Sequence, residues 1–546
     1  MNIRKWVLHN ALQFDGKASA GAVIGKVVQE DAQAKKDMKK LAMQVQGIIK
    51  EVNLLSVVEQ KKELEKLAPE LLEEKPKEKQ DLKPLPNAEG KIVFRIAPEP
   101  SKYLHVGHAL IFMIQNLYAK KHNGTLNLRI EDTNPEKSEE EFLNAMKEDL
   151  EWLGLRFDKE IVVSDHLEIF YTYAEKLIKT GGAYVCSCSQ EDIKTLRMQK
   201  RACPCRQNNS MDEWKKMLDG SYKDGERILR LVGDMQSNNG VLRDPIIFRL
   251  SSTPHYKQGD KFRVWPTYDF ENAIADSHWK TTHVIRSKEF ELREPLQEII
   301  RERLGLKGPT TLEIGRFRIS GAETQGRVIR AMIDKKEVTG WDDPRLVTVK
   351  AIRRRGFVKE MIQELALVVG LGKAGGAIDI KTLEGINRKI VDPIAPRFFF
   401  ISEPTLITIE NAPEKSVELD LHPDAKKGGR RMQTTNAFMV EKKDLERLED
   451  GQEYRLMDCL NFKKEGTKFV FTSETNKEFT GKQRIHWLPA RENDKASVMM
   501  PDAKIVHGLV EKGVSSLKEG DILQFERFGF CRLDSKNELQ FRYTHA

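Results

Sequence analysis

A chain of 546 residues and 62.7 kDa is too long for a single hydrophobic core, so we expect several domains. Hydrophobic residues make up 39% of the chain and charged residues 32%, a composition that excludes a membrane-spanning or a disordered protein. The 91 basic and 83 acidic residues leave a formal net charge of +8, which permits a polyanionic partner without requiring one.

The N-terminal segment carries no secretion signal. In "MNIRKWVLHNALQFDG" the polar residues His9, Asn10, Gln13 and Asp15 interrupt the apolar run. We therefore expect a cytoplasmic protein, with neither a membrane nor DNA as a partner.

From Lys26 to about Leu72 the apolar residues recur at intervals of three and four, which predicts helices. The following segment, "EEKPKEKQDLKPLPNAEG", is rich in proline and charge and is typical of a linker. We expect a separate helical domain before it, which offers a surface for a protein partner.

After the linker, the pattern alternates between strand and helix. "KIVFRIA" predicts a strand, His108 to Tyr118 a helix, and "LNLRI" and "EIVVSD" two further strands. This order predicts an α/β fold with a doubly wound parallel sheet. Ligands bind such sheets at the carboxyl ends of the strands, where "APEPSKYLHVGH" would lie.

Four of the six cysteines lie together in "CSCSQEDIKTLRMQKRACPC". Cys186, Cys188, Cys203 and Cys205 form two C-x-C pairs, which favour a tetrahedral Zn²⁺ site over disulfides in a chain without a secretion signal. Four buried reduced thiols are the alternative. Cys459 and Cys531 lie in strand-like runs and are expected in the core.

From Arg327 to about Leu371 helical spacing returns, and beyond Phe398 short β-rich runs such as "KFVFTS" and "ILQFERFGFCRL" alternate with turn residues. This texture predicts antiparallel β-barrels.

The two histidines of "YLHVGHAL" stand between a strand and a helix. Gly107 lets a ligand approach the backbone, and the helix N-terminus attracts phosphate. His105 and His108 can then stabilise charge on a transferring phosphoryl group.

Several blocks resemble those of the glutamyl/glutaminyl branch of class I aminoacyl-tRNA synthetases, in the same order along the chain. They are "APEPSKYLHVGHAL", similar to the HIGH motif, "LRIEDTNPEKSEEEF", "WPTYDFENAIADSHWKTTHVIRSKEF", "GWDDPRL" with "RRRGF", and "VDPIAPRFFF". A run of long blocks in one order is highly specific. The resemblance implies a Rossmann-type catalytic domain that attaches an amino acid to tRNA using ATP and Mg²⁺.

The resemblance also implies a domain order. We expect a helical domain and linker at 1–88, the two halves of the catalytic domain at 89–169 and 261–326, and an acceptor-end-binding insertion with the zinc site at 170–260. A helical connecting domain at 327–397 and a β-barrel anticodon-binding region at 398–546 would follow.

The amino-acid specificity depends on Arg286. Glutaminyl enzymes carry cysteine there and glutamyl enzymes carry arginine, whose guanidinium can pair with the side-chain carboxylate of L-glutamate. An arginine that pairs with a structural carboxylate is the alternative. The resemblance places Arg95, Glu131 and Tyr268 in the same amino-acid pocket, with Glu131 receiving the α-amino group.

The residues expected to bind ATP come from two of the blocks and from the segment that follows the second of them. They are Glu99, Pro100, His105, Gly107, His108, Ser287, Arg316 and Phe317. The reaction implied is attack of the glutamate α-carboxylate on the α-phosphate, followed by transfer to the 3′ end of tRNA. Both steps require positioning and charge stabilisation rather than a protein nucleophile.

One signature departs from the family's pattern. The KMSKS loop, whose lysine reaches the phosphates, should precede "GWDDPRL", and counting back places it at "TQGRV", residues 324–328. The lysine position falls on Gly326, with Arg327 beside it. Either Arg327 supplies the phosphate contact as a third catalytic residue, or activation is impaired.

Two basic runs are expected to contact tRNA phosphates: Arg353 to Arg355, and Lys426, Lys427, Arg430 and Arg431. Solvated surface charge is the alternative.

The sequence therefore predicts a glutamate–tRNA ligase, charging tRNA(Glu) and potentially tRNA(Gln), with a β-rich C-terminus. A glutaminyl enzyme and a catalytically weakened tRNA-binding relative are the alternatives. A small nucleotidyltransferase with the same histidine motif fails on length.

Overall fold

The structure is a computed structural model that describes residues 3–13, 16–30, 37–72, 81–481 and 483–546. The chain divides into two units, Met1–Asp81 and Leu82–Ala546. Residues 73–80 of the expected linker lie outside the described ranges. In those ranges no helix is long and apolar enough to cross a membrane.

The N-terminal unit is built from helices. They are α1 (Ile3–Gln13), α2 (Ala20–Glu30), α3 (Met38–Val52), α4 (Val57–Leu67) and the short 3₁₀ turn η2 (Pro69–Leu71). Val7, Leu8, Val27, Val45 and Leu64 are almost fully buried between them. The helices begin earlier in the chain than the expected start at Lys26, because the short apolar faces of α1 and α2 complete the core.

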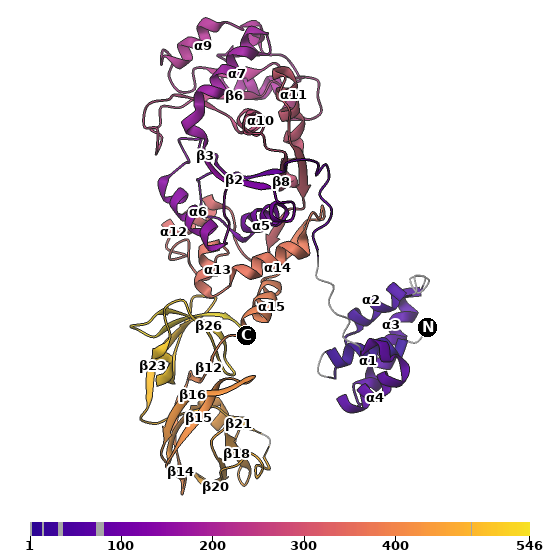
Figure 1. The fold of residues 1–546 in the computed structure, drawn as a ribbon, viewed down its shortest axis with the longest axis vertical. Helices are drawn as coiled ribbons and strands as arrows, with labels where there is room; N and C mark the ends of the chain where they lie inside the picture. The colour runs from indigo at the N-terminus through magenta and orange to yellow at the C-terminus, as the bar shows by residue number, and fades with distance from the viewer. Residues whose placement is uncertain (1–2, 14–15, 31–36, 73–80, 482) are drawn as a thin grey trace. The chain divides into compact units, whose positions relative to one another are not determined.

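A five-stranded parallel sheet forms the centre of the larger unit, in the order β3-β2-β1-β8-β9 (Figure 1). Its strands are β1 (Val93–Ile96), β2 (Thr125–Ile130), β3 (Lys159–Val162), β8 (His283–Ser287) and β9 (Thr310–Ile314). Helices α5 (Val106–Lys121), α6 (Glu140–Trp152), α10 (Tyr268–His278) and α11 (Glu294–Leu304) connect or flank them. The predicted doubly wound α/β fold is confirmed.

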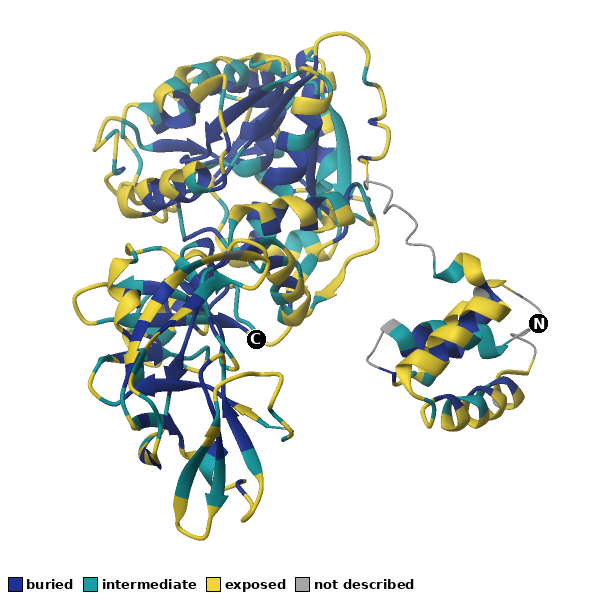
Figure 2. Ribbon diagram, turned by 60° about the horizontal axis from the view of Figure 1, so that its bottom comes forward, coloured by how far each residue is buried: buried dark blue, intermediate teal, exposed yellow. Residues whose placement is uncertain are grey.

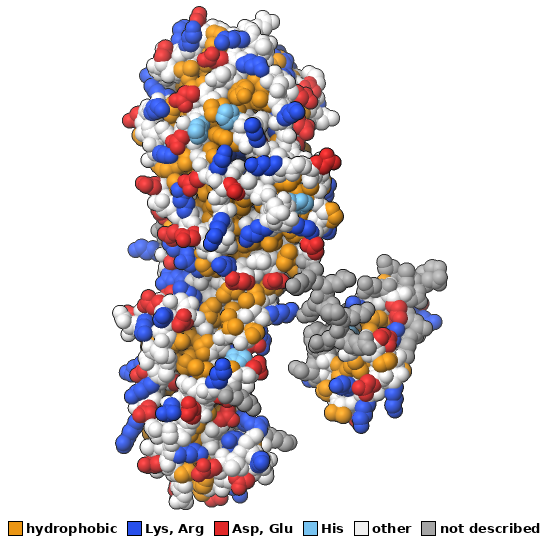
Figure 3. Space-filling model, viewed as in Figure 1, with side chains coloured by type: hydrophobic (Ala, Val, Ile, Leu, Met, Phe, Trp, Pro, Cys, Tyr) orange, Lys and Arg blue, Asp and Glu red, His pale blue; other side chains and the backbone are white. Residues whose placement is uncertain are grey.

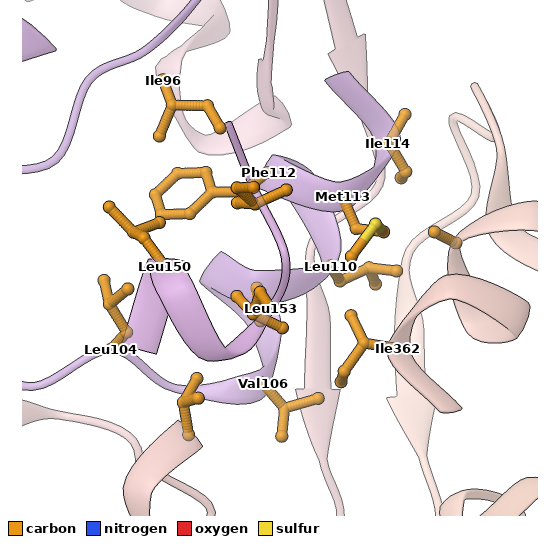
Figure 4. Packing of buried hydrophobic residues seen from close by; sticks show 14 of the residues in the cluster. Ile96, Leu104, Val106, Leu110, Phe112, Met113, Ile114, Leu150, Leu153 and Ile362 are labelled. Atoms are coloured by element: carbon orange, nitrogen blue, oxygen red, sulfur yellow. The ribbon is translucent and has the colours of Figure 1, made fainter. Parts of the chain in front are cut away.

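Helix α5 is the main cover of the sheet. Its side chains Leu110 and Met113 point toward Ile362 of α14 (Lys359–Val369), as Figure 4 shows. Strand β1 is buried along its whole length, and Figure 2 shows the same burial for the central strands. A strand covered on both faces reads as a continuous apolar run, which explains the pattern of "KIVFRIA".

Between β3 and β8 the chain builds a second, antiparallel sheet in the order β4-β5-β6-β7. Its strands are β4 (Ala183–Cys186), β5 (Ile228–Leu231), β6 (Ile246–Leu250) and β7 (Val264–Pro266). Helices α7 (Leu167–Lys179), α8 (Gln190–Met198) and α9 (Met211–Leu218) accompany it, with 3₁₀ turns η3 (Val163–His166), η4 (Pro204–Gln207) and η5 (Gly240–Leu242). A core around Trp214, Phe248 and Trp265 holds this layer together.

Helical segments follow strand β8 and, beyond β9, continue to the C-terminal part. They are the 3₁₀ turn η6 (Lys288–Arg293), α12 (Gly326–Asp334), α13 (Val349–Arg355), α14 and α15 (Ile380–Val391), together with the small parallel pair β10 (Phe317–Ile319) and β11 (Gly376–Ile378). Positive φ angles at Gly305 and Gly356 end α11 and α13 in the left-handed region.

The C-terminal part is β-rich, as predicted. One sheet has the order β12 (Arg397–Phe398), β25 (Ile522–Phe525), β26 (Gly529–Ser535), β27 (Gln540–His545), β23 (Asn493–Met499), β24 (Ile505–Glu511), β13 (Phe400–Ile401). The other has the order β21 (Arg484–Ile485), β18 (Glu453–Leu456), β19 (Asn461–Glu465), β20 (Lys468–Ser473), β14 (Pro404–Glu410), β17 (Ala437–Glu441), β22 (Trp487–Pro489). Strands β15 (Lys415–His422) and β16 (Ala425–Thr434) form a hairpin; α16 (Lys442–Leu445) and η7 (Lys512–Ser516) complete the region.

Most neighbours in these sheets are antiparallel, but β12–β25, β14–β20, β18–β21 and β23–β27 pair in parallel. We therefore describe the region as two mixed sheets. Cys459 and Cys531 lie in their cores, as predicted.

Candidate active site

A cavity of about 810 Å³ lies at the carboxyl ends of strands β1, β2 and β8. The loop after β1 contributes Glu99 and Lys102, the loop after β2 contributes Glu131 and Thr133, and β8 ends at Ser287 on its wall. This is the position at which a doubly wound sheet binds its ligands.

The two histidines of "YLHVGHAL" stack at the start of α5. Their ring centroids are 3.8 Å apart, and the planes are inclined by 23°. Gly107 N–H donates to Nδ1 of His105 at 3.0 Å, and the backbone N–H of His105 donates to Nδ1 of His108 at 3.4 Å. Because both Nδ1 atoms accept, the proton of each neutral imidazole is assigned to Nε2.

Both imidazoles are neutral at physiological pH. Burial, helped by the positive charges of Lys102 and Arg316, lowers the pKa of His105 to about 3. Burial and the neighbouring His105 lower the pKa of His108 well below its usual range. The pair is therefore suited to donate hydrogen bonds from Nε2–H rather than to carry charge.

Gly107 is required for this stacking. A Cβ at this position would lie 2.9 Å from Cε1 of His105 and 3.6 Å from the carbonyl oxygen of Phe317. Glycine therefore lets the imidazole fold back over the helix N-terminus, with β10 close behind it.

A buried polar network braces the other end of the cavity. Asp276 of α10 accepts from Nε of Arg95 at 3.2 Å and from Nη1 of Arg129 at 2.6 Å. Asn272 Oδ1 accepts from the same two arginines at 3.1 and 2.8 Å. Burial alone would raise the pKa of Asp276, but Arg129 and Arg95 hold it at about 2. The network fixes β1 and β2 against α10.

The four residues predicted to bind the amino acid all line the cavity: Arg95, Glu131, Tyr268 and Arg286. Arg129 donates to Glu131 at 2.7 Å. Burial, with the charge of Glu131 nearby, raises the pKa of Tyr268, so its hydroxyl stays protonated. The side chain of Tyr268 packs on Phe290, with ring centroids 5.4 Å apart.

Arg286 has features of both expectations: it lines the cavity, as predicted for a residue that binds the amino acid, and it also pairs with structural carboxylates. Its Nη1 donates to Gln297 Oε1 at 3.1 Å, and its Nη2 pairs with Glu294 and, at 3.5 Å, with Glu313. Its Nε is buried and has no hydrogen-bond partner among the described residues. Structural carboxylates therefore hold the guanidinium, while the side chain still lines the cavity.

The predicted ATP-binding residues are only partly brought together. Glu99, His108 and Ser287 line the cavity, whereas His105, Gly107, Pro100, Arg316 and Phe317 are not part of its wall. Arg316 is exposed and pairs with Glu289, a cavity residue, at 3.3 Å. The side chain of Arg327 is exposed at the first turn of α12, and Arg327 does not line the cavity.

Sequence reasoning missed several charged cavity residues, among them Lys102 and Glu271. Lys102 lies three residues before His105, inside the motif loop, so its position alone could have identified it. Glu271 faces the cavity from α10 and accepts a short hydrogen bond from Thr133, while its Oε1 is buried without a partner. Burial and the charge of Glu131 raise the pKa of Glu271 well above its usual range. No pattern in "YDFENAIAD" distinguishes this glutamate from a surface one.

The four clustered cysteines converge, as predicted for a metal site. Their sulfur atoms all lie within 4.8 Å of one another, and none of the four is in a disulfide. The Sγ of Cys203 lies 3.5 Å from that of Cys186 and 3.3 Å from that of Cys188, which lies 3.8 Å from that of Cys205. A tetrahedron with Zn–S bonds of about 2.3 Å has edges of about 3.8 Å, so this donor set fits zinc.

In the first basic run, Arg353 to Arg355, two of the three side chains pair with protein groups rather than facing solvent. Arg354 forms a fork with Asp534 of β26, from Nε at 3.0 Å and Nη2 at 2.8 Å. Arg355 is buried and donates to the carbonyl oxygen of Thr544 at 3.0 Å. Only Arg353 in this run is exposed, because the helix turns its two neighbours toward the C-terminal sheet.

In the second basic run, Arg430 is closed to RNA in the same way, whereas Lys427 and Arg431 are exposed. Arg430 is buried and pairs with Glu511 and, at 2.7 Å, with Glu526. Arg431 is exposed and lies 3.3 Å from Glu418. On the face seen in Figure 3, Lys and Arg side chains are interspersed with Asp and Glu. The expectation that Arg355 and Arg430 contact phosphate was therefore wrong.

Comparison with known proteins agrees with this arrangement. A profile of the catalytic domain of tRNA synthetases class I (E and Q) matches residues 91–393, and profiles of their anti-codon binding domain match residues 395–479 and 484–534. A glutamate–tRNA ligase of Pyrococcus furiosus is 41% identical over 97% of this chain and 96% of its own length. Those of Methanothermobacter marburgensis and Nitrosopumilus maritimus are each 36% identical, over 100% of this chain and 99% and 98% of their own lengths.

Proposed function

The chain belongs to the class I tRNA synthetases of the E and Q family, and from this premise we propose that it is a glutamate–tRNA ligase. The glutamate α-carboxylate attacks the α-phosphate of ATP, which is supplied as its magnesium complex, and pyrophosphate leaves. The glutamyl group then passes from the adenylate to the terminal ribose of tRNA. The similar ligases named above support this proposal.

In this proposal the cavity orders glutamate by charge. Glu131 accepts from the α-ammonium, and the guanidinium of Arg286, whose side chain lines the cavity, donates to the side-chain carboxylate. The walls that hold these groups are braced by buried ion pairs, so little reorganisation accompanies binding.

The histidine pair acts at the phosphates. Each neutral ring has its Nδ1 engaged by a backbone N–H, which leaves Nε2–H to donate to phosphate oxygens as charge develops. This function does not require protonation, so it is insensitive to pH near neutrality.

The observation that carries the assignment to glutamate is the buried guanidinium of Arg286 on the cavity wall. A neutral glutamine amide would leave that charge without a counter-charge from the substrate. The alternative of a glutaminyl enzyme is therefore disfavoured. Whether tRNA(Gln) is a second substrate is a separate question that concerns the anticodon-binding region.

Aminoacylation of unfractionated tRNA tests the proposal. The purified chain is given ATP and Mg²⁺ with labelled glutamate or labelled glutamine, and the charged tRNA species are identified by sequencing. Attachment of glutamate alone is the expected result. Attachment of glutamine alone would overturn the specificity, and binding of tRNA without attachment of either amino acid would favour the weakened relative.

We also propose that Cys186, Cys188, Cys203 and Cys205 hold a structural Zn²⁺. The ion would cross-link the end of β4 to η4 and supply no chemistry to the cavity. Metal analysis of the purified chain is expected to find about one zinc per chain. Cys203→Ser is expected to lose it, whereas the buried Cys531→Ser serves as a matched control and is expected to keep it.

A protein partner for the N-terminal unit is a further part of the proposal. Leu54, Met43 and Val58 are 87%, 65% and 64% exposed there, which is apolar area available for contact. The double variant Leu54→Asp and Val58→Asp is expected to charge tRNA normally while losing any co-purifying protein. Retention of that protein would exclude these side chains from the contact.

A further inference from the structure

Lys102, which lines the cavity, lies against Gly326. A Cβ built on Gly326 would lie 2.9 Å from Cβ of Lys102, 3.0 Å from its Cδ and 3.5 Å from its Cγ. The aliphatic stem of the lysine therefore occupies the space in which a side chain at position 326 would begin. The two residues come from separate segments, the loop after β1 and the first turn of α12.

The ammonium of Lys102 is held near the histidine pair without a direct partner. Lys102 lines the cavity beside Glu99 and His108, and within the described ranges its Nζ makes no hydrogen bond or ion pair. Burial lowers the pKa of Lys102, while the more distant charges of Glu99 and Glu289 raise it. A partly buried cation that faces a cavity without a counter-ion is suited to bind an anion.

Position 326 is where the family's second signature would place its lysine. Here that position holds glycine, and Arg327 next to it is exposed and is not part of the cavity wall. In the described structure, the loop after β1 therefore brings a cation, Lys102, to the histidines, and residues 324–328 do not.

We propose that Lys102 contacts the phosphates of ATP during formation of the adenylate, and that Gly326 is glycine because the lysine stem passes over it. This inference rests on the proposed ligase function and adds a catalytic residue to it. In the step concerned, a carboxylate oxygen of glutamate bonds to the α-phosphorus as the bond to the bridging oxygen breaks. That electron pair leaves on pyrophosphate, where the ammonium of Lys102 stabilises the added charge.

The test moves the lysine from position 102 to position 326. Four forms are compared: Lys102→Met, Gly326→Lys, the double variant K102G/G326K, and Lys335→Met as a control lysine at the exposed far end of α12. Pyrophosphate exchange is measured with ATP, glutamate and tRNA present. Melting temperature and tRNA affinity are measured on the same samples.

Lys102→Met is expected to lower the exchange rate roughly 100-fold, which is the usual effect of removing one charge-stabilising donor, with the KM for glutamate unchanged. Gly326→Lys alone is expected to be impaired because its side chain collides with Lys102. The double variant K102G/G326K is expected to regain at least about tenfold over Lys102→Met, since glycine at position 102 removes the Cβ, Cγ and Cδ atoms that crowd position 326 and a lysine returns to the phosphates from the other loop.

Exchange by Lys102→Met at the wild-type rate would overturn the inference. A loss in Arg327→Ala together with full activity in Lys102→Met would transfer the role to Arg327. If Lys102→Met is unstable, Lys102→Arg is tested in its place, because it keeps the positive charge and the aliphatic stem. A Lys102→Arg protein that melts normally but is as inactive in pyrophosphate exchange as Lys102→Met would also overturn the inference. Failure of the wild-type chain to charge tRNA would instead refute the proposed function itself.

Discussion

Arg286 and Arg430 are both buried arginines held by two glutamates, yet they differ in how many donors remain. Arg430 directs Nε and Nη2 to Glu511 and Nη1 to Glu526, so each of its nitrogens has a carboxylate partner. Arg286 uses only Nη1 and Nη2, its Nε is buried without a hydrogen-bond partner among the described residues, and its side chain lines the cavity. An incompletely paired guanidinium on a cavity wall, rather than positive charge itself, is what we expect to distinguish a binding arginine from a structural one.

Arg95 follows the same rule on the neighbouring strand β1. Its Nε and Nη2 are taken by Asp276 and Asn272, while Nη1 has no partner among the described residues and the side chain lines the cavity. The rigid fork of a guanidinium allows this division, because one edge can be fixed while another faces a ligand.

The largest effect is expected at the fully paired arginine. Arg430→Met leaves Glu511 buried and unpaired, which should lower the free energy of unfolding of the C-terminal sheets by about 3–5 kcal/mol. Denaturant unfolding monitored by tryptophan fluorescence measures it. The KM for glutamate should not change in protein that remains folded; a selective rise in that KM would break the comparison.

Arg286→Cys should act on catalysis instead. Loss of the charged donor is expected to lower kcat/KM for glutamate roughly 30- to 1000-fold, corresponding to about 2–4 kcal/mol. Steady-state charging of tRNA measures this, with Arg286→Lys expected to lie in between because it keeps the charge without the fork. Unchanged glutamate kinetics in Arg286→Cys would show that this arginine is only structural.

Asp276→Asn tests the network that fixes Arg95 and Arg129. The pKa of Asp276 is about 2 in the folded state and near 3.8 in the unfolded state. Its ionised form therefore stabilises the fold above pH 3.8, and this stabilisation is lost as the pH falls toward 2. The variant should be less stable by about 2 kcal/mol at neutral pH. Thermal unfolding between pH 7 and pH 2.5 should show a weaker pH dependence in the variant; parallel curves would contradict the assigned pKa.

The smallest effect separates two neighbours in one basic run. Exposed Arg353→Ala should reduce the salt dependence of tRNA binding by about one unit of slope, as expected for one phosphate contact. Arg354→Ala should leave that slope unchanged, because both edges of its guanidinium are engaged by Asp534 and Asp342. The affinity for tRNA, measured from about 50 to 200 mM salt, distinguishes the two variants. A slope reduced by the same amount in both variants would show that Arg354 contacts the RNA as well.

The sequence predicted the cavity better than it predicted the basic surface. The residues predicted for the amino-acid pocket lie at or just after the carboxyl ends of strands, or at a helix start, and a parallel sheet brings such positions together regardless of their distance along the chain. The partners of Arg355 and Arg430 lie in C-terminal strands whose pairing no local pattern specifies. A run of lysines and arginines therefore appears exposed until the sheets that cover it are known.

The contact between Lys102 and Gly326 was beyond sequence reasoning for a related reason. The missing lysine at position 326 is visible in the sequence, but its consequence depends on which side chain fills the vacated space. Packing at about native density leaves no such space empty, and only the folded arrangement shows that the first loop fills it.

The strand order of the parallel sheet also affects how this protein folds during synthesis. The backbone N–H of Val93 in β1 bonds to Thr282, 189 residues later, because the whole antiparallel insertion separates β1 from β8. At about 5–20 residues per second, a ribosome needs roughly 10–40 s to make that segment. During that time one edge of the central strand is open, which makes the nascent chain a substrate for chaperones that shield apolar strands.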